Sequence, residues 1–187
     1  MNHSIPKANL ANTLPVLKYG NPILREKVQI LEDFTNLPNM VAQMIETMDA
    51  ERGIGLAANQ VGWNVNLMVI DTRHYNEDED GEYHIIANAE ILSSEGEFIM
   101  EEGCLSIPDI RAEIKRPETI LLKYQDMKQN IHEKYFSGLV SRAIQHEFDH
   151  LNGKLFIDYL SQTKRMLINK RLLEISKTGR PSSSIIL

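Results

Sequence analysis

The sequence predicts an α+β protein in which short antiparallel or mixed β-sheets surround a central helix, with a further helix toward each end of the chain. Short runs of β-branched and apolar residues predict strands, and these strands are separated from three helical patterns instead of alternating with them. The 187 residues are 42% apolar and 25% charged, which is typical of a folded domain. No stretch approaches the roughly 18 apolar residues of a membrane span.

The first helix is predicted to begin near Pro38 and to end near Gly53. Apolar residues recur there on one helical face, at Val41, Met44, Ile45 and Met48. Short strands are then predicted at residues 65–70, 84–87, 119–124 and 131–136. The acidic segment 71–81 between the first two strands is predicted to be an exposed loop.

A second helix is predicted to follow Gly138 and to end near Gly153. A third helix is predicted over residues 161–177, with five apolar positions that are expected to dock it: Met166, Leu167, Leu172, Leu173 and Ile175. The segment 178–187 contains Gly179, Pro181 and three serines, so a flexible tail is expected, and residues 1–15 are expected to be loose. No linker composition interrupts the chain, which predicts one catalytic domain over residues 1–187.

The segment from Gly53 to Gly62 raises the question of a nucleotide site. Gly53, Gly55 and Ala58 satisfy G-x-G-x-x-A, and Asp71 stands roughly where a ribose-binding acid would be expected. A dinucleotide loop, however, follows a strand and opens a helix. Gly53 follows a helix, and the residues before the strand at Val65 leave no room for a crossover helix. The nucleotide interpretation is therefore rejected.

Charge and cysteine content restrict the class of function. A net charge of -6 argues against a general nucleic-acid binder and against DNA as a partner. Residues 161–187 carry six basic side chains and one acid, Glu174, so this segment carries +5 and the rest of the chain -11. A single cysteine, Cys104, excludes an internal disulfide and is typical of a cytoplasmic protein.

The sequence His146-Glu147-Phe148-Asp149-His150 carries the chemistry. Positions i and i+4 lie one above the other on a helix, so both imidazoles can bind one metal ion. Glu147 is adjacent without needing to ligate, and can take a proton from water at the ion. A zinc-type site needs a third protein ligand. Cys104 and Glu174 are both candidates, and spacing alone does not choose between them.

Three segments together resemble the peptide deformylase family. G-x-G-x-A-A-x-Q spans Gly53 to Gln60, E-G-C-x-S spans Glu102 to Ser106, and Q-H-E-x-D-H-L-x-G spans Gln145 to Gly153. The segments occur in the family's order, and the resemblance extends from about Val16 to Lys177. The helical C-terminus resembles a bacterial subclass.

This resemblance implies a hydrolase that removes the N-formyl group from formyl-methionyl nascent peptides. It implies Cys104, His146 and His150 as metal ligands and Glu147 as general base and later acid. The side-chain amide of Gln60 and the backbone N–H of Leu105 are implied as donors to the developing oxyanion. Substrate-binding positions are implied at Ile54, Gly55, Met100, Gly103, Arg111, Leu139 and Ala143. Glu102 is expected to partner a ligand histidine.

The resemblance also implies Fe(II) as the native ion, with nickel or cobalt as active substitutes, although the ligand types equally suit zinc. The basic C-terminal helix is expected to bind the ribosome, and no membrane partner is expected. Two other hypotheses remain open at this point. One is a zinc endopeptidase with Glu174 as third ligand, and the other is a non-enzymatic ribosome-associated factor.

Overall fold

The computed structural model describes residues 13–73 and 83–187 and has the predicted α+β architecture. The helices are α1 (Leu37–Ala50), α2 (Gly138–Leu151) and α3 (Gln162–Thr178), with short 3-10 turns η2 (Pro22–Arg25), η3 (Ala58–Val61) and η4 (Phe156–Tyr159). The strands are β1 (Gly55–Ala57), β2 (Leu67–Asp71), β3 (Tyr83–Glu95), β4 (Phe98–Cys104), β5 (Ile107–Arg116), β6 (Thr119–Gln125), β7 (Ile131–Ser137) and β8 (Ile185–Ile186).

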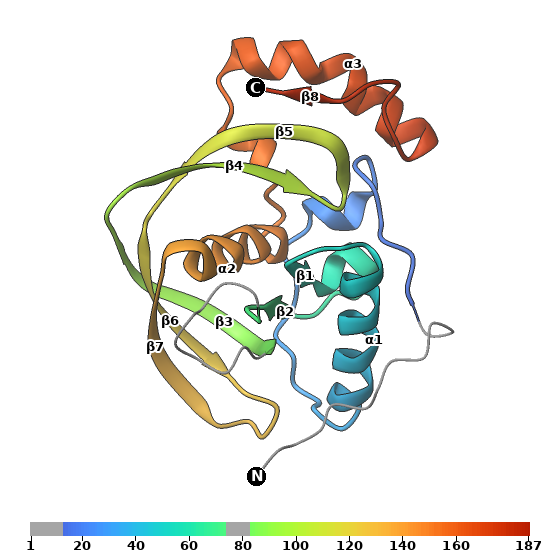
Figure 1. Ribbon diagram of the computed structural model, residues 1–187. Coiled ribbons are helices and arrows are strands. Elements are labelled where there is room, and N and C mark those ends of the chain that lie inside the picture. The colour runs from blue at the N-terminus through green and yellow to red at the C-terminus, as the bar shows by residue number, and fades with distance from the viewer. Residues whose placement is uncertain (1–12, 74–82) are drawn as a thin grey trace.

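Two sheets enclose α2. The larger sheet has the strand order β1-β2-β3-β6-β7 and is antiparallel throughout, and the smaller has the order β4-β5-β8. Figure 1 shows α2 at the centre of the molecule, between the pair β4–β5 above it and the larger sheet below it. The second predicted helix is therefore the central element of the fold, and both of its flanks face protein.

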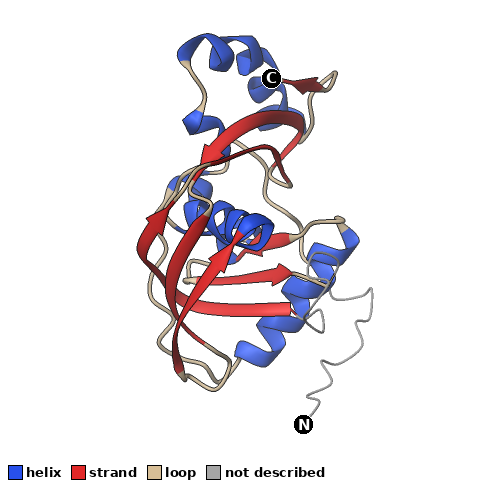
Figure 2. Cartoon of the chain, turned by 60° about the vertical axis from the view of Figure 1, so that its left-hand side comes forward, coloured by secondary structure: helices blue, strands red, loops and turns tan. Residues whose placement is uncertain are grey.

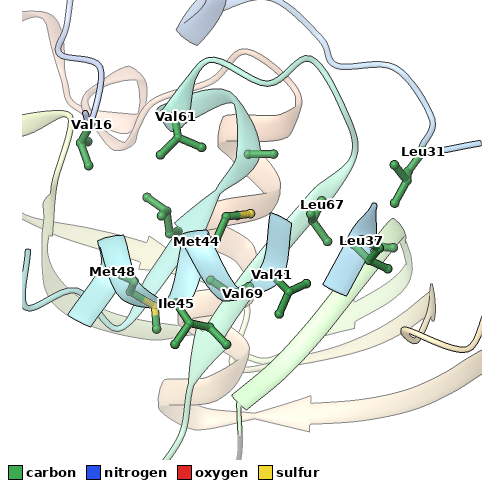
Figure 3. Packing of buried hydrophobic residues seen from close by; sticks show 13 residues of the cluster. Val16, Leu31, Leu37, Val41, Met44, Ile45, Met48, Val61, Leu67 and Val69 are labelled. Carbon is green, nitrogen blue, oxygen red and sulfur yellow. The ribbon is translucent and has the colours of Figure 1, made fainter. Parts of the chain in front are cut away.

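The first core cluster forms where α1 packs on β1 and β2. All four predicted positions on the inner face of α1 are buried, and Leu37 extends this face. They meet Leu56, Leu67 and Val69 from the strands, as Figure 3 shows for the labelled residues. The 3.6-residue periodicity therefore predicted this interface. It holds in place the segment that leads from α1 into β1.

A separate core cluster joins α3 to β5 and η4. Figures 1 and 2 both place α3 and β8 on the far side of β5 from α2. The buried positions of α3 are Ile168, Leu172 and Ile175. The expected docking face was therefore partly wrong, since Met166, Leu167 and Leu173 are exposed. Apolar residues are spread around this helix, so periodicity alone did not single out the buried face.

The glycine-containing segment forms β1, η3 and a turn into β2, with no crossover helix. Gly55 pairs with Ile70 and Ala57 with Met68 in an antiparallel ladder. The N–H of Gly53 closes the end of α1 by donating to Met48 O at 2.9 Å. This connection excludes the Rossmann arrangement, in which a parallel strand and a helix flank the loop.

Several local expectations were wrong. β1, β4, β5 and β8 were not predicted, although β5 alternates buried and exposed residues from Ile110 to Arg116. The tail is not loose, because Ile185 and Ile186 pair with β5. Leu14, in the segment expected to be loose, donates its N–H to Thr47 Oγ1 at 2.9 Å. Of the predicted loop 71–81, Asp71 ends β2 and residues 74–81 lie outside the described residues, as do residues 1–12.

No helix among the described residues combines the length and the apolar character that crossing a membrane requires.

Candidate metal centre

Helix α2 places His146 and His150 on one side, one turn apart. Their ring centroids are 5.1 Å apart, and His150 is almost completely buried. The sequence predicted this juxtaposition from the four-residue spacing. Burial, followed by the neighbouring charge of His146, lowers the pKa of His150 and keeps its imidazole neutral, which is the form that ligates metals.

The third converging group is Cys104, at the end of β4. Its Sγ lies 3.1 Å from His150 Nε2, and the ligand atoms of Cys104, His146 and His150 all lie within 4.8 Å of one another. A register shift in the β4–β5 pairing falls between Glu102 and Cys104, at Gly103. Such a bulge re-aims the side chain that follows it. Spacing alone had left this ligand open, and the family resemblance had implied Cys104.

The alternative ligand Glu174 is not part of this group. It lies on α3, where its Oε2 accepts hydrogen bonds from Ser182 N at 2.8 Å and Ser182 Oγ at 2.9 Å. One thiolate and two imidazoles suit zinc and other divalent transition ions. The residues present therefore fit a single divalent metal ion, which Cys104, His146 and His150 would hold.

Glu102 links the candidate ligand His146 to a buried ion-pair network. Its Oε2 accepts from His146 Nδ1 at 2.9 Å, and its Oε1 accepts from Arg116 Nε and Arg142 Nη1, each at 2.6 Å. Burial alone would raise the pKa of Glu102, but the bonds from His146 and Arg116 hold it well below its usual range. The carboxylate is thus ionised and fixes the orientation of the His146 ring.

Arg116 extends this network back to α2. Its Nη1 donates to Asp149 Oδ2 at 2.7 Å, and Tyr159 OH donates to the other Asp149 oxygen at 3.0 Å. Sequence reasoning named Glu102 but missed Arg116 and Asp149 as partners. Asp149 lies inside the H-E-x-D-H motif. Its position on the helix, away from the face that carries the two histidines, was the feature of the sequence that could have indicated a partner role.

Glu147 faces the segment β1. The Oε1 of Glu147 lies 2.6 Å from the position that a Cβ at Gly55 would occupy, and Glu147 Cγ lies 2.9 Å from it. Among the described residues, no donor bonds to the buried Oε2 of Glu147. Burial raises the pKa of Glu147 to about 7, and a cation held by the neighbouring ligands would lower it again. A carboxylate with one free oxygen and such a pKa is suited to proton transfer.

Gly55→Ala is expected to lower kcat by about 10- to 100-fold, because the added methyl group displaces the Glu147 carboxylate by a fraction of an ångström or more. Metal content should change little, since Gly55 is not one of the candidate ligands. Metal analysis and turnover measured on the same preparation check this. Unchanged turnover would show that the contact does not position Glu147.

The two expected oxyanion donors, Gln60 and Leu105, both border the cavity. Gln60 is buried, its Oε1 accepts from Ala57 N at 2.9 Å, and its Nε2 donates to Ser106 Oγ at 3.2 Å. The same Nε2 lies 3.7 Å from Cys104 Sγ. The amide is therefore held with its two N–H groups toward Ser106 and the candidate ligand Cys104.

Hydrogen bonds to backbone oxygens fix the segments around these donors, and the sequence did not predict them. Lys18 Nζ donates to Leu105 O at 2.9 Å, and Tyr19 N donates to Ser106 O at 2.8 Å. Asn59 Nδ2 donates to His150 O at 2.6 Å. Asn59 lies in the first motif beside Gln60, but nothing local indicates that it faces the end of α2.

A cavity of about 670 Å³ brings the remaining candidates together. It is bordered by Gln60, Cys104, Leu105, His146 and Glu147 and by all seven positions proposed for substrate binding: Ile54, Gly55, Met100, Gly103, Arg111, Leu139 and Ala143. The methyl and methylene groups of several of these residues make part of the wall apolar. The tail residues Ser184, Ile185 and Ile186 also border it, which the sequence did not predict.

Comparison with known proteins agrees with this arrangement. Residues 13–166 match the family model described as polypeptide deformylase. The chain is 40% identical over 176 residues to the peptide deformylase of Flavobacterium johnsoniae, covering 88% of this chain and 90% of that one. It is 44% identical over 174 residues to that of Zymomonas mobilis, covering 90% and 98%.

Solved structures of peptide deformylases are also similar to this chain. A peptide deformylase from Legionella pneumophila superposes with a TM-score of 0.80 at 36% identity, covering 89% of this chain and 97% of that chain. The enzyme from Thermus thermophilus gives 0.82 at 34% identity, covering 88% and 98%. With a family match over most of its length, and with a Cys-His-His cluster next to Glu147, the chain belongs to the polypeptide deformylase family.

Proposed function

We infer that this protein is a metal-dependent peptide deformylase that removes the N-formyl group from the N-terminal formyl-methionine of newly synthesised polypeptides and releases formate. The observation that carries this function is the convergence of Cys104, His146 and His150 beside Glu147, in a chain of this family. Cys104, His146 and Glu147 border the cavity of about 670 Å³, which is large enough to admit a substrate side chain.

The residues of the chain account for the proton transfer from water to the amine and for the charge that develops on the carbonyl oxygen; the formic acid then loses its proton to the amine or to water and leaves as formate. A divalent ion at Cys104, His146 and His150 would activate water and polarise the formyl carbonyl. Glu147 accepts a proton from the attacking water through its free oxygen and returns it to the departing amine nitrogen as the carbon–nitrogen bond breaks. Gln60 Nε2 and the Leu105 N–H donate to the carbonyl oxygen as negative charge develops on it.

The cavity wall supports methionine as the first residue of the substrate. Ile54, Met100, Leu139 and Ala143 offer apolar contacts of the kind that an unbranched thioether side chain fills. Arg142 also borders the cavity, but its guanidinium is engaged by Glu102 and by Ile114 O at 3.0 Å, which leaves its methylene groups for the pocket. Gly55 lets the peptide backbone approach Glu147 closely.

The function is tested by formate release from formyl-Met-Ala-Ser, with acetyl-Met-Ala-Ser as a control for the acyl group. Formate and free Met-Ala-Ser are expected in equal amounts from the first peptide, and no product from the second. Cleavage of an internal peptide bond without formate would favour an endopeptidase. If neither peptide yields a product at full metal occupancy, the result would favour the non-enzymatic role.

We propose Fe(II) as the native ion, with nickel, cobalt and zinc able to occupy the same ligands. Cys104→Ser is expected to remove the sulfur-to-metal charge-transfer band of the cobalt-substituted protein and to lower metal affinity by about 10-fold or more. Absorption spectroscopy and metal titration measure both effects. An unchanged cobalt spectrum would take Cys104 out of the coordination sphere.

We also propose that the exposed basic side of α3 binds the ribosome in the cytoplasm, where nascent chains emerge. Lys170 and Lys177 are exposed on α3, and the remainder of the chain is acidic. Lys170→Glu/Lys177→Glu should reduce co-sedimentation with ribosomes at low salt but leave turnover of a short formyl peptide unchanged. The control Lys128→Glu/Lys134→Glu makes the same charge change on β7 and the turn before it. Equal loss in both variants would indicate an effect of net charge only.

A further inference from the structure

The C-terminal tail borders the same cavity as His146 and Glu147. Strand β8 runs parallel to β5, with Ile110 opposite Ile185 and Arg111 opposite Ile186. Leu187 N donates to Arg111 O at 3.0 Å, and Glu113 N donates to Leu187 O at 3.1 Å. Figure 1 shows β8 lying between β5 and α3. The tail thus adds a third strand to the sheet that supplies Cys104.

Side-chain contacts with α3 hold this strand in place. Ser182 donates from both its backbone N and its Oγ to Glu174, while Arg171 Nε donates to Ser183 O at 3.0 Å. Ile185 and Leu187 pack against the core cluster of α3 and β5. Ile186 is therefore carried on a backbone that is hydrogen-bonded to β5 on one side and to α3 on the other.

The side chain of Ile186 lies on the face of the sheet that carries Arg111, and both residues border the cavity. Paired residues in neighbouring strands share a face, so Ile185 lies with the buried Ile110, and Ile186 lies with Arg111. The Arg111 side chain lies over Gly103, with its Cγ 3.5 Å from the position of a Cβ there. Ile186 itself remains 66% exposed and borders the same cavity as His146 and Glu147. A large apolar side chain is thus left in contact with water at the rim of the cleft.

The distance from the metal ligands sets which substrate residue would meet Ile186. The path from the end of β4 across β5 to β8 crosses two strand spacings, or about 10 Å. An extended peptide advances about 3.3 Å per residue, so this path corresponds to about three residues from the formyl carbon. On such a path, the side chain of the third residue would arrive at Ile186.

We propose that Ile186 is a specificity-determining residue that contacts an apolar side chain at the third position of the formyl peptide, an inference that rests on the proposed deformylase function. The tail strand supplies this contact beside Arg111, so the enzyme favours a branched or linear aliphatic third residue over a polar one. Burying part of that side chain against Ile186 removes apolar surface of both from water, which stabilises the complex. Arg111 lies beside this contact, with its Nε paired to Glu101 Oε1 at 2.7 Å.

The test compares two substrates that differ only at the third residue, formyl-Met-Ala-Leu and formyl-Met-Ala-Ser. Ile186→Ser should lower kcat/KM for the leucine peptide by about fivefold and change it for the serine peptide by less than about twofold. Leu173→Ser is the control, because Leu173 is a similarly exposed apolar residue on α3 outside the cavity. It should leave the ratio of the two values unchanged.

A second variant makes the test independent of any loosening of the tail. Ile186→Lys should raise kcat/KM for formyl-Met-Ala-Asp above the value that the native protein gives with the same peptide, whereas a detached tail would only lower kcat/KM for formyl-Met-Ala-Leu. If the native protein releases formate but neither variant changes the ratio between substrates, the assignment of Ile186 is wrong and the deformylase function stands. If the native protein releases formate from none of these peptides, the proposed function itself is wrong.

Discussion

Glu147→Gln is expected to reduce kcat for formate release by about 10²–10⁴-fold while the protein keeps its metal. Glutamine has nearly the same shape and fits the same contact with Gly55, but its amide cannot accept and return a proton. The carboxylate is buried, and burial raises its pKa to about 7, so the protein maintains a proton acceptor near neutral pH. Removing that acceptor takes away activation of the water and protonation of the leaving amine together.

Steady-state turnover and metal analysis on the same preparation measure this effect. Glu133→Gln is a matched control, since it makes the same substitution at an exposed position on β7. It should change kcat by less than about twofold. Loss of metal together with activity in Glu147→Gln would contradict the assignment, because it would make Glu147 a ligand or a structural residue instead of a base.

Arg116→Leu is expected to lower the free energy of unfolding by about 3–5 kcal/mol. The guanidinium is buried and pairs with Glu102 at 2.6 Å and with Asp149 at 2.7 Å. Glu102 would keep its bonds from Arg142 and His146, whereas the Asp149 carboxylate would keep the bond from the Tyr159 hydroxyl and lose its cation. A buried carboxylate without a cation is costly, and the loss also loosens the carboxylate that orients the candidate ligand His146.

Urea unfolding at neutral pH, on protein freed of metal, measures this loss without the stabilisation that bound metal adds. Lys115→Leu is the control, because Lys115 forms an exposed ion pair with Glu97, and such pairs contribute about 0–1 kcal/mol. The double variant Arg116→Leu/Asp149→Asn should recover part of the stability, since it removes the unpaired charge. A loss below about 1 kcal/mol in Arg116→Leu would contradict the importance of this network.

Local sequence patterns were sufficient for the features that depend on one helix or one short segment. The inner face of α1 followed from the spacing of Val41, Met44, Ile45 and Met48, and the paired histidines of α2 followed from four-residue spacing. Rejection of a nucleotide loop also followed from order along the chain, because Gly53 comes after a helix. In each case the deciding geometry is the periodicity of a single element.

The third ligand could not be chosen in this way. Cys104 and Glu174 are both far from His146 in sequence, and only the bulge at Gly103 and the packing of β4 against α2 bring the thiol to 3.1 Å from His150. The partners of Glu102 are similarly distributed over β5 and α2. Ligand sets and ion-pair networks of this kind depend on contacts between distant segments, and a local sequence pattern does not predict such contacts.

The sequence by itself therefore determined the α+β class and the helix that carries two of the candidate ligands, and its family resemblance implied many, though not all, of the positions that border the cavity. The family resemblance implied Cys104 as the third group, but only the tertiary structure shows the contacts that bring it to those histidines, which face of α3 is buried, and where the tail goes. Strand β8 shows the reason most clearly. Two residues are too short for any periodicity, and Ile185 and Ile186 become a strand only because β5 offers an edge and Arg111 O accepts from Leu187 N.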